Sequence, residues 1–550
     1  MNAMGTAGTP FLFVLDYALR HPLVLPLNQV DSRHLRYDLK GCGNIAAPSA
    51  LPEPGWGIQD VAAIPFARYG KAFEHVRRAQ LDGESYLLNL TASTPVRYRG
   101  RLSELLPHLQ APYRLWMNGS LSGRDGDGIL VASPEAFVRI EGNAIRTFPM
   151  KGSLRCPPSE ADAAAQRLLA DGKEAAEHVT VVDLLRNDLA RVSRDVAVPR
   201  YRFAEAVHLT DSVLLQTSSE VVGRLEKGWQ ERIGTIFREL LPAGSVTGAP
   251  KSRTCAHIAR AEAMLGHERG LYCGVFGVFD GKMLESAVAI RVLEDRGTVP
   301  GEENLRAGIF KSGGGVTVQS DPRREWQELS DKISLPLPPI LLETMRLEDG
   351  ELQRREFHQR RLERSSLDCF GEPPHWRLEQ AIAGLPDRKR PGRWKLRLSY
   401  TSRAWKLEAL SYEIRRPRRL YAVEAGALDY RHKFLDRSGI GRLRSECAHR
   451  HGLDPADPSW DILLMHEGQI LEGSYAALVC RLDGTLRTPE KPLLSSTRIA
   501  AYLEERRVLP APLTLEELLR ADGIWLVNAM IDLEDEVRIA SQDIVRDFHD

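Results

Sequence analysis

The sequence predicts a two-domain protein of the mixed α/β (α+β) class. Its 550 residues exceed the usual size of one domain, which is roughly 100–200 residues. In the N-terminal part, apolar runs with strand composition, such as 270–281 and 287–294, alternate with helical patterns such as 173–192. The Pro-dense segment 335–340 separates this part from a second set of strand and helix patterns. We therefore predict domains over 1–332 and 341–550, joined by a linker over 333–340.

The overall composition excludes several classes of protein. The 74 Lys and Arg residues balance 74 Asp and Glu residues, so the chain lacks the basic excess of a dedicated nucleic-acid binder. No apolar run is long enough to span a bilayer, and the first one contains Asp16, where a signal peptide would stay apolar. The seven cysteines show no C-x-x-C spacing, which argues against a disulfide framework. We expect a cytoplasmic protein with neither nucleic acid nor membrane as a partner.

Two pairs of carboxylates stand at helical spacing in the first domain. Glu174 and Glu177 lie three residues apart in the helical pattern 173–192. Glu325 and Glu328 repeat this spacing after Asp321-Pro322, where the Asp is a typical helix N-cap and the Pro a typical first residue. If they converge, the two pairs suit Mg²⁺, but solvated helices carry the same spacing.

The segment 241–253 is rich in Gly, Ser and Thr and ends near Lys251, as a phosphate-binding loop does. Pro250 stands where such a loop needs Gly, and it removes one backbone N–H donor. Nucleotide binding is therefore disfavoured, although Lys251 still offers a cation to a small anion.

Seven motifs occur in the order typical of one enzyme family. They are SPEAF (133–137), FPMKGS (148–153), KEAAEHVTVVDLLRNDLARV (173–192), PAGSVTGAPK (242–251), YCGVFG (272–277), AIRV (289–292) and SGGGVTVQSDPRREWQE (312–328). Together they closely resemble the chorismate-binding enzymes, which include anthranilate, aminodeoxychorismate, isochorismate and salicylate synthases. The resemblance covers roughly 80–332 and implies an α/β sandwich with its site in a central cleft.

This resemblance assigns roles to individual residues. The carboxylates that hold Mg²⁺, directly or through water, match Glu174, Glu177, Glu325 and Glu328, and we expect Glu177 and Glu328 to be the direct ligands. The implied substrate-binding residues are Arg291, Tyr272, Gly313, Gly314, Gly315, Lys332 and Thr247. Glu135 matches the general acid that protonates the departing ring hydroxyl of chorismate.

Lys151 distinguishes among the members of this family. Aminodeoxychorismate synthases carry Lys in the P-x-K-G-T motif, where the other synthases typically carry Ala, and this chain reads PMKGS. The resemblance implies that a neutral Lys amine adds to the ring and that ammonia then displaces it. The chain shows no evident amidotransferase nucleophile, so we expect a separate glutamine amidotransferase subunit to supply ammonia.

The second domain opens with a predicted hairpin around Asp349-Gly350. The segments LLETMRLEDG (341–350), FHQRRLERS (357–365), DYRHKFLDR (429–437), DILLMHEGQILEGS (461–474) and TPEKPLL (488–494) resemble fold-type IV pyridoxal-phosphate enzymes, which include aminotransferases and aminodeoxychorismate lyases. The resemblance implies an α/β domain of two subdomains. We expect that any homodimer forms through this domain.

The second resemblance also implies a cofactor site for pyridoxal phosphate. Lys433 matches the residue that holds the cofactor and moves the proton, and Glu472 matches the acid beside the pyridine nitrogen. Arg361 matches the phosphate-binding arginine. The family's Gly-containing turn is shortened to LLSSTR (493–498), and NAMID (528–532) lacks one hydroxyl anchor for the phosphate, so we expect Ser495, Ser496 and Thr497 to compensate. A further departure from the family pattern is Ala477, where lyases often carry Asn.

The two domains together predict a reaction sequence. The first would aminate chorismate to aminodeoxychorismate, and the second would eliminate pyruvate to leave p-aminobenzoate, a folate precursor. Three alternatives remain open: a synthase with a non-catalytic second domain, an anthranilate-type synthase with an aminotransferase-like tail, and a non-catalytic anion-binding module.

Overall fold

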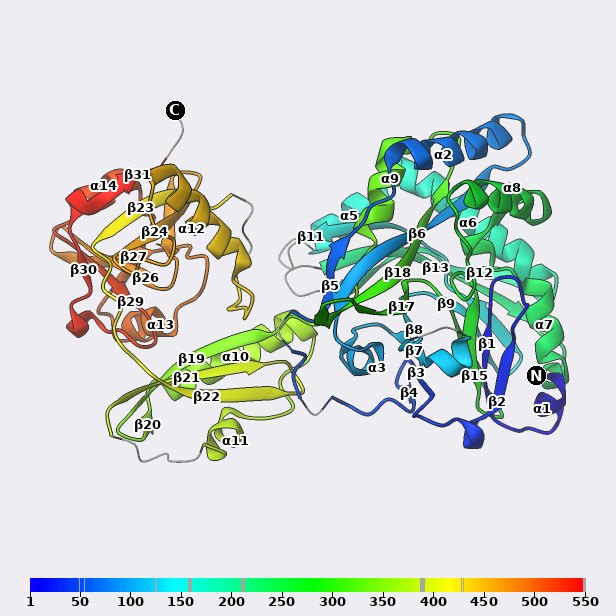
Figure 1. The fold of residues 1–550 in the computed structure, drawn as a ribbon, viewed down its shortest axis with the longest axis horizontal. Coiled ribbons are helices and arrows are strands. Elements are labelled where there is room, and N and C mark those ends of the chain that lie inside the picture. Colours follow the sequence, from blue (N-terminus) through cyan, green and yellow to red (C-terminus); the bar gives the residue numbers. More distant parts are fainter. Residues whose placement is uncertain are drawn as a thin grey trace. The chain divides into compact units, whose positions relative to one another are not determined.

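The computed structural model describes residues 1–48, 50–53, 55–123, 126–156, 161–208, 213–385, 391–426, 428 and 430–547. The chain forms two compact units (Figure 1). The first comprises Met1–Ala47, Pro52–Val207 and Ser212–Pro338, and the second consists mainly of Pro339–Asp550. Both units combine helices and strands, which confirms the predicted α/β class.

The first unit contains two large sheets. In one sheet the strand order is β11-β13-β10-β9-β16-β15-β1-β2, with β12 beside β13. Its strands are β1 (Phe11–Leu15), β2 (Leu23–Pro26), β9 (Ala136–Glu141), β10 (Ala144–Thr147), β11 (Met150–Cys156), β12 (Arg194–His208), β13 (Val213–Arg224), β15 (Val275–Phe279) and β16 (Leu284–Val288). In the other the order is β14-β6-β18-β17-β8-β7-β3-β4, with β5 beside β6. Its strands are β3 (Leu35–Leu39), β4 (Cys42–Gly43), β5 (Gly57–Val61), β6 (Leu87–Arg99), β7 (Tyr113–Met117), β8 (Ile129–Ser133), β14 (Gly248–Ala249), β17 (Val292–Val299) and β18 (Glu302–Val316).

Apolar side chains join these two sheets into a sandwich. Phe13 and Phe276 of the first sheet share one buried cluster with Leu115 and Val131 of the second. Strands β1, β8 and β15 are buried at every position, which explains their continuous apolar sequences. The sandwich architecture implied by the sequence is therefore present.

Helices surround the sandwich (Figure 1). They are α1 (Asn2–Thr6), α2 (Phe66–Leu81), α3 (Leu102–Leu105), α4 (Gly119–Ser122), α5 (Ala161–Ala170), α6 (Gly172–Ala190), α7 (Ile233–Leu240), α8 (Lys251–Met264) and α9 (Pro322–Asp331). Tyr69 of α2, Ile258 of α8 and Leu329 of α9 pack against Leu88 of β6 in one buried cluster. The helical pattern predicted for 173–192 is confirmed by α6.

The second unit begins with a small sheet in the order β20-β19-β21-β22. It consists of β19 (Leu341–Glu348), β20 (Glu351–Leu352), β21 (Arg393–Tyr400) and β22 (Trp405–Ser411), and α10 (Arg355–Phe370) and α11 (Leu378–Ala383) pack on it. The predicted hairpin is confirmed: β19 pairs with β20, and Asp349 and Gly350 both have positive φ, 49° and 85°.

Two further sheets form the rest of the second unit, in the orders β25-β24-β23-β31 and β28-β27-β26-β29-β30. Their strands are β23 (Arg419–Glu424), β24 (Trp460–His466), β25 (Gln469–Gly473), β26 (Ala477–Leu482), β27 (Thr485–Pro489), β28 (Leu509–Ala511), β29 (Gly523–Val527), β30 (Arg538–Ile539) and β31 (Ile544–Arg546). The helices of this part are α12 (Ser438–His451), α13 (Thr497–Glu504) and α14 (Leu515–Leu519). Leu463 and Leu478 share the core between the two sheets.

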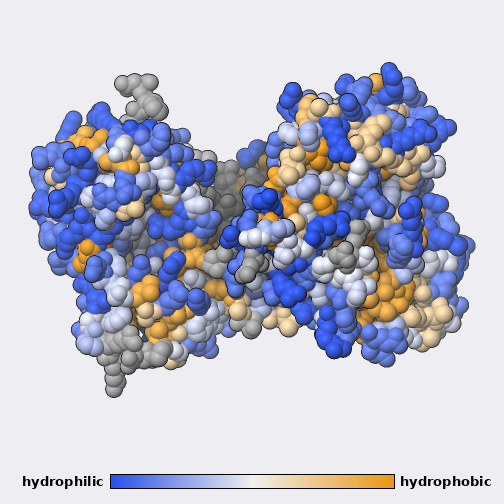
Figure 2. Space-filling view, in the orientation of Figure 1, coloured by the Kyte–Doolittle hydropathy of each residue, from blue (hydrophilic) through white to orange (hydrophobic). Residues whose placement is uncertain are grey.

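The surface is consistent with the balanced composition. The face drawn in Figure 2 is mostly hydrophilic, and its hydrophobic side chains gather in several separate patches. None of the helices in the described ranges is both long and apolar enough to cross a bilayer.

Strands β6 and β18 approach closely at a run of glycines. Gly313 pairs with Thr91 and Gly314 with Leu90. A Cβ on Gly313 would lie 2.5 Å from the Thr91 methyl carbon and 2.6 Å from the Leu90 carbonyl oxygen. A Cβ on Gly314 would meet only the ends of charged side chains, 3.3 Å away or more. Gly313 is therefore required for the pairing, whereas Gly314 leaves open space beside it.

These two glycines give a matched test of the packing. We expect Gly313→Ala to lower the free energy of unfolding by at least about 2 kcal/mol, because the backbone of β6 cannot move aside. Gly314→Ala should change it by less than about 1 kcal/mol, because flexible side-chain ends can shift. Urea unfolding of both variants measures the difference, and equal losses would contradict the assignment.

Candidate active sites

The end of β18 and helix α9 bring several predicted site residues of the first unit together. Lys332, directly after α9, donates through Nζ to the Gly313 carbonyl (2.9 Å) and pairs with Glu328 (2.7 Å). The position of a Cβ on Gly314 is 3.3 Å from Glu325 Oε2 and 3.8 Å from Glu328 Oε1. The absent side chain of Gly314 thus leaves a cradle that faces two carboxylates and a cation.

Helix α9 holds these carboxylates because its start is well defined. The Asp321 carboxylate accepts the N–H groups of Arg323 (3.0 Å) and Arg324 (2.9 Å), and Pro322 is the first helical residue. This confirms the predicted helix start. Glu325 and Glu328, one turn apart, consequently face the same side.

Glu135 lies between β8 and β9, and its N–H donates to Ser133 Oγ (3.1 Å). Burial raises the pKa of its carboxyl, although a hydrogen bond with Ser245 and the charge of Lys332 act in the opposite direction. A carboxyl with a raised pKa keeps its proton closer to neutral pH, as a general acid requires. Ser245 was not among the predicted site residues, because a serine in a Gly-rich turn gives no signal of its own.

Three other predicted substrate residues differ in their surroundings. Tyr272 is almost fully buried, and burial raises the pKa of its hydroxyl well above the usual value. Arg291 is half-buried in a left-handed backbone conformation (φ 55°), and within the described residues it has no carboxylate partner. Thr247 is fully buried and its hydroxyl donates to the Ala243 carbonyl (2.8 Å), so its proton is already used within the chain.

A buried ion pair connects the Gly-rich segment 241–253 to strand β6. Arg269 contacts Glu262 at 2.7 Å and also donates to the carbonyls of Val246 and Asn89, both at 2.7 Å. Thr91 Oγ1 donates to Glu262 (2.5 Å). The sequence reasoning missed this network. Glu262 lies in a helix and Arg269 in the loop after it, and charged residues at such positions usually lie on the surface.

Some predictions fall outside the described side chains. Lys151 lies in β11, and Glu174 and Glu177 lie in α6, but the structure describes no side-chain geometry for them. Lys251, which the sequence offers as a cation for a small anion, pairs through its ammonium with Asp188 (2.7 Å) and donates to the Leu240 carbonyl (2.8 Å).

In the second unit, the five predicted cofactor residues line one cavity. They are Arg361, Lys433, Glu472, Ser496 and Thr497. The cavity is also lined by Tyr430, Arg437, Ser474, Tyr475, Ala477 and Asn528. Residues from α10, β25, the start of α13 and the loop before α12 thus converge, although more than 130 positions separate Arg361 from Thr497 in the sequence.

The two central ionisable groups of this cavity have strongly shifted pKa values. Burial and the cations Arg361 and Arg437 lower the pKa of Lys433 to about 7. Burial raises the pKa of Glu472 to about 8, although the N–H of Leu494 and the charge of Lys433 oppose the shift. A substantial fraction of Lys433 is therefore a neutral amine at neutral pH, the form that acts as nucleophile or base.

Arg361 is held by a buried carboxylate. Its Nε and Nη2 contact Glu343 at 3.1 and 2.5 Å, and its Nη1 donates to the Ser495 carbonyl (3.0 Å). His358 Nδ1 lies 2.5 Å from the same carboxylate. Although burial opposes it, Arg361 and His358 bring the pKa of Glu343 down to about 2. A guanidinium has five N–H donors, so Arg361 keeps donors for an anion in the cavity.

The start of α13 adds anion-binding groups. Ser496 caps the helix by accepting the N–H of Ile499 (3.4 Å). Among the described residues Thr497 Oγ1, which is buried, has no hydrogen-bond partner, and the first backbone N–H groups of a helix have none within the helix. An orphaned hydroxyl, a helix N-terminus and Arg361 together suit a phosphate. These residues therefore fit the phosphate of pyridoxal phosphate, the cofactor that the resemblance implies.

Among the cavity residues that sequence reasoning missed are Arg437 and Asn528. Arg437 donates to the Ser474 carbonyl, and Asn528 donates to the Tyr475 carbonyl (3.3 Å). Arg437 stands four positions after Lys433, a spacing that could have suggested a shared site. Asn528 belongs to NAMID, which was interpreted only as the loss of a hydroxyl anchor.

Comparison with known proteins is consistent with these two sites. Residues 28–338 match the family model of the chorismate binding enzymes, and the chain belongs to this family. Residues 341–533 match the amino-transferase class IV model.

An uncharacterized PabA-like protein of Pasteurella multocida is 40% identical over 336 residues, which cover 61% of this chain and 97% of that protein. Aminodeoxychorismate synthase component 1 of Salmonella typhimurium is 32% identical, with 50% of this chain and 56% of that protein covered. Several anthranilate synthase components 1 match over similar lengths. The solved structure of a candidate 4-amino-4-deoxychorismate lyase from Haemophilus somnus is 26% identical, covers 35% of this chain and 96% of that one, and has a TM-score of 0.32.

The role of Glu343 can be tested directly. Glu343→Gln removes the charge that holds Arg361, and removal of one partner of a buried ion pair typically costs about 3–5 kcal/mol. We expect lower stability in urea and at least about tenfold weaker binding of pyridoxal phosphate, followed by its visible absorption. Glu351→Gln, on the exposed strand β20, is the control. Unchanged cofactor affinity would contradict this role of Glu343.

The lowered pKa of Lys433 predicts that its amine reacts with acylating reagents at a lower pH than an ordinary lysine. Since only the neutral amine reacts with an acylating reagent, labelling of Lys433 should rise with a midpoint near pH 7, the value to which its pKa is lowered. Mass spectrometry of the labelled peptides measures the profile, and Lys406, with 70% of its side chain exposed, serves as the reference. Identical profiles for the two lysines would contradict the shift.

Proposed function

We propose that this chain makes p-aminobenzoate from chorismate in two steps. The first unit would aminate chorismate to 4-amino-4-deoxychorismate with Mg²⁺, and the second would eliminate pyruvate with the help of pyridoxal phosphate. The observation that carries the proposal is the cavity that unites Lys433, Glu472 and Arg361 in a chain that also has a chorismate-binding domain. A lyase is the enzyme that the product of such a synthase requires next.

The first step uses groups of the first unit. Arg291 and the Gly313–Gly315 strand end, with Lys332 beside it, would bind the carboxylates of chorismate. Glu135 would donate its proton to the departing ring hydroxyl, which leaves as water. Glu325 and Glu328, with Glu174 and Glu177, would hold Mg²⁺, since hard carboxylate oxygens are the ligands that this ion prefers. When bound, Mg²⁺ supplies Lewis-acid polarisation of the substrate carboxylate.

Lys151 is the residue that favours amination at the position para to the ring carboxylate. Its amine would add to the ring as the hydroxyl leaves, and ammonia would then displace it at the carbon that carried the hydroxyl, so that the new amine ends para to the ring carboxylate. A glutamine amidotransferase subunit is the proposed source of ammonia. Anthranilate synthases are also among the relatives, so anthranilate synthesis is the competing function, and the product assay below distinguishes the two.

In the second step the residues of the cavity bind the amine and move one proton. Arg361, Ser496, Thr497 and the N-terminus of α13 would hold the cofactor phosphate, and Glu472 would stand beside the pyridine nitrogen. When bound, pyridoxal phosphate supplies an electron sink. Lys433 would take the proton from the amine-bearing ring carbon, and loss of the enolpyruvyl group as pyruvate makes the ring aromatic.

One product assay tests both steps. The purified chain is mixed with chorismate, Mg²⁺, ammonium and pyridoxal phosphate, and we expect p-aminobenzoate and pyruvate in equal amounts. Lys433→Ala should accumulate aminodeoxychorismate, and Lys151→Ala should lower its formation by at least about 10²-fold, since each removes a reacting group. Lys406→Ala, on the exposed edge of β22, should behave as the wild type.

Other products would contradict specific parts of the proposal. Anthranilate as product, or full activity of Lys151→Ala, would favour an anthranilate-type synthase. Aminodeoxychorismate as the end product of the wild type would show that the second unit is not a lyase.

A further inference from the structure

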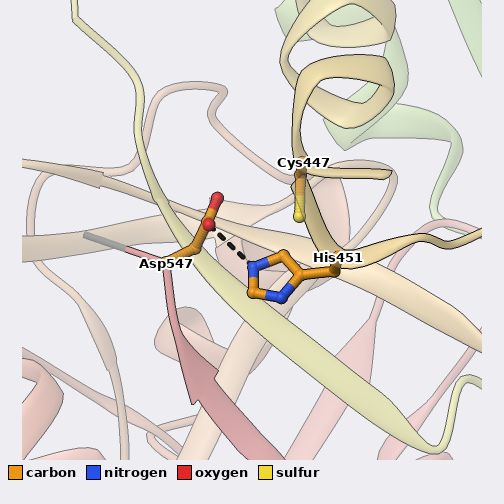
Figure 3. Close-up of side chains that lie close together, drawn as sticks. All are labelled: Cys447, His451 and Asp547. Carbon is orange, nitrogen blue, oxygen red and sulfur yellow. Dashed lines mark hydrogen bonds and ion pairs between the residues drawn. The ribbon is translucent and has the colours of Figure 1, made fainter. Parts of the chain in front are cut away.

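A cluster of sulfur, nitrogen and oxygen groups lies at the C-terminal end of α12. Cys447 and His451 are four residues apart and therefore share one face of this helix. Asp547 follows β31, and Figure 3 shows the three side chains pointing toward one another. Their potential ligand atoms all lie within 4.8 Å of one another, and His451 Nε2 is 2.7 Å from Asp547 Oδ1.

The surrounding structure fixes the position of each group. Strand β31 runs parallel to β23, and the N–H of Asp547 donates to the Ala422 carbonyl (3.1 Å). The ring of Tyr421 packs against the His451 imidazole, with 4.7 Å between ring centroids. Cys447 is fully buried, and only 5% of the Asp547 side chain is exposed. The cluster is thus a preformed set of groups in which the cysteine is buried, the aspartate is partly buried and the histidine is exposed, unlike a group of acidic residues on the surface.

We propose that Cys447, His451 and Asp547 bind one divalent cation of the zinc class. A thiolate, an imidazole and a carboxylate form a ligand set that this borderline-soft ion accepts, with a water molecule in the fourth position. In a tetrahedral site the imidazole nitrogen and carboxylate oxygen would lie about 3.3 Å apart. The cation therefore needs the 2.7 Å contact to open by about half an ångström, the ligand atoms that lie up to 4.8 Å apart to move closer together, and the thiol to release its proton.

Arg450 defines the competing explanation for this cluster. Its guanidinium also contacts the Asp547 carboxylate, so an ion-pair network alone would tie the end of the chain to α12. The two explanations differ at Cys447, because a thiolate is a strong zinc ligand whereas a thiol adds little to an ion pair. The thiol is therefore the group on which a test should focus.

A cation at this position would act as a structural link. Helix α12 begins at Ser438, directly after the loop with Lys433 and Arg437, and ends at His451. The cation would join its far end to the last strand, β31. This role does not depend on the proposed reactions of either unit.

The test uses the full chain without an affinity tag, stripped with a chelator and kept in excess Mg²⁺. Titration with Co²⁺ should give one thiolate-to-metal charge-transfer band per chain, saturating at one equivalent and displaced by Zn²⁺. Cys447→Ser should abolish this band, and His451→Asn should weaken Zn²⁺ binding at least about tenfold. Cys42→Ser, at an exposed cysteine of the first unit, should leave both unchanged.

Several results would overturn the proposal. A wild-type chain without a thiolate band, or a band that persists in Cys447→Ser, would leave the ion-pair network as the explanation. Circular dichroism checks that the variants fold. If Cys447→Ser does not fold, the wild-type titration and His451→Asn decide.

Discussion

The candidate site of the first unit depends on one buried ion pair, Arg269–Glu262. Arg269 joins the helix α8 region to the carbonyls of Val246 and Asn89, which belong to the Gly-rich segment and to β6. These contacts fix the segment with Ser245 beside the strand that pairs with the glycine run. A surface ion pair adds little, but loss of one partner of a buried pair leaves an unpaired charge and costs about 3–5 kcal/mol. The geometry around Glu135 and Gly314 is therefore inseparable from this interaction.

In the second unit, charged groups line the candidate site itself. Its cavity gathers Arg361, Arg437 and Lys433, and burial together with the two arginine charges lowers the pKa of the lysine to about 7. Arg361 stays charged, as guanidinium groups in proteins do, and it is held in place by Glu343, which His358 also contacts. The same guanidinium thus offers donors to an anion and lowers the pKa of the lysine. One arginine would serve both binding and proton transfer.

Sequence patterns predicted the features that are set by local chemistry. The helix start at Asp321-Pro322 and the hairpin at Asp349-Gly350 follow from capping and turn preferences of single residues. The resemblance to known families pointed to five of the residues that line the cavity of the second unit. It could not predict the partners of Lys251 and Thr247, because Asp188 and Ala243 reach them only through the tertiary fold. Long-range partners of this kind, including Glu343 for Arg361, carry no signal in one sequence.

The two compact units, each with its own hydrophobic core, belong to one polypeptide. Translation therefore produces them at a fixed ratio of one to one, whatever the level of expression. Separate enzymes need matched synthesis to keep such a ratio, whereas covalent linkage also keeps the effective concentration of one unit around the other independent of dilution. Stoichiometry, which other systems must regulate, is here a property of the gene product itself.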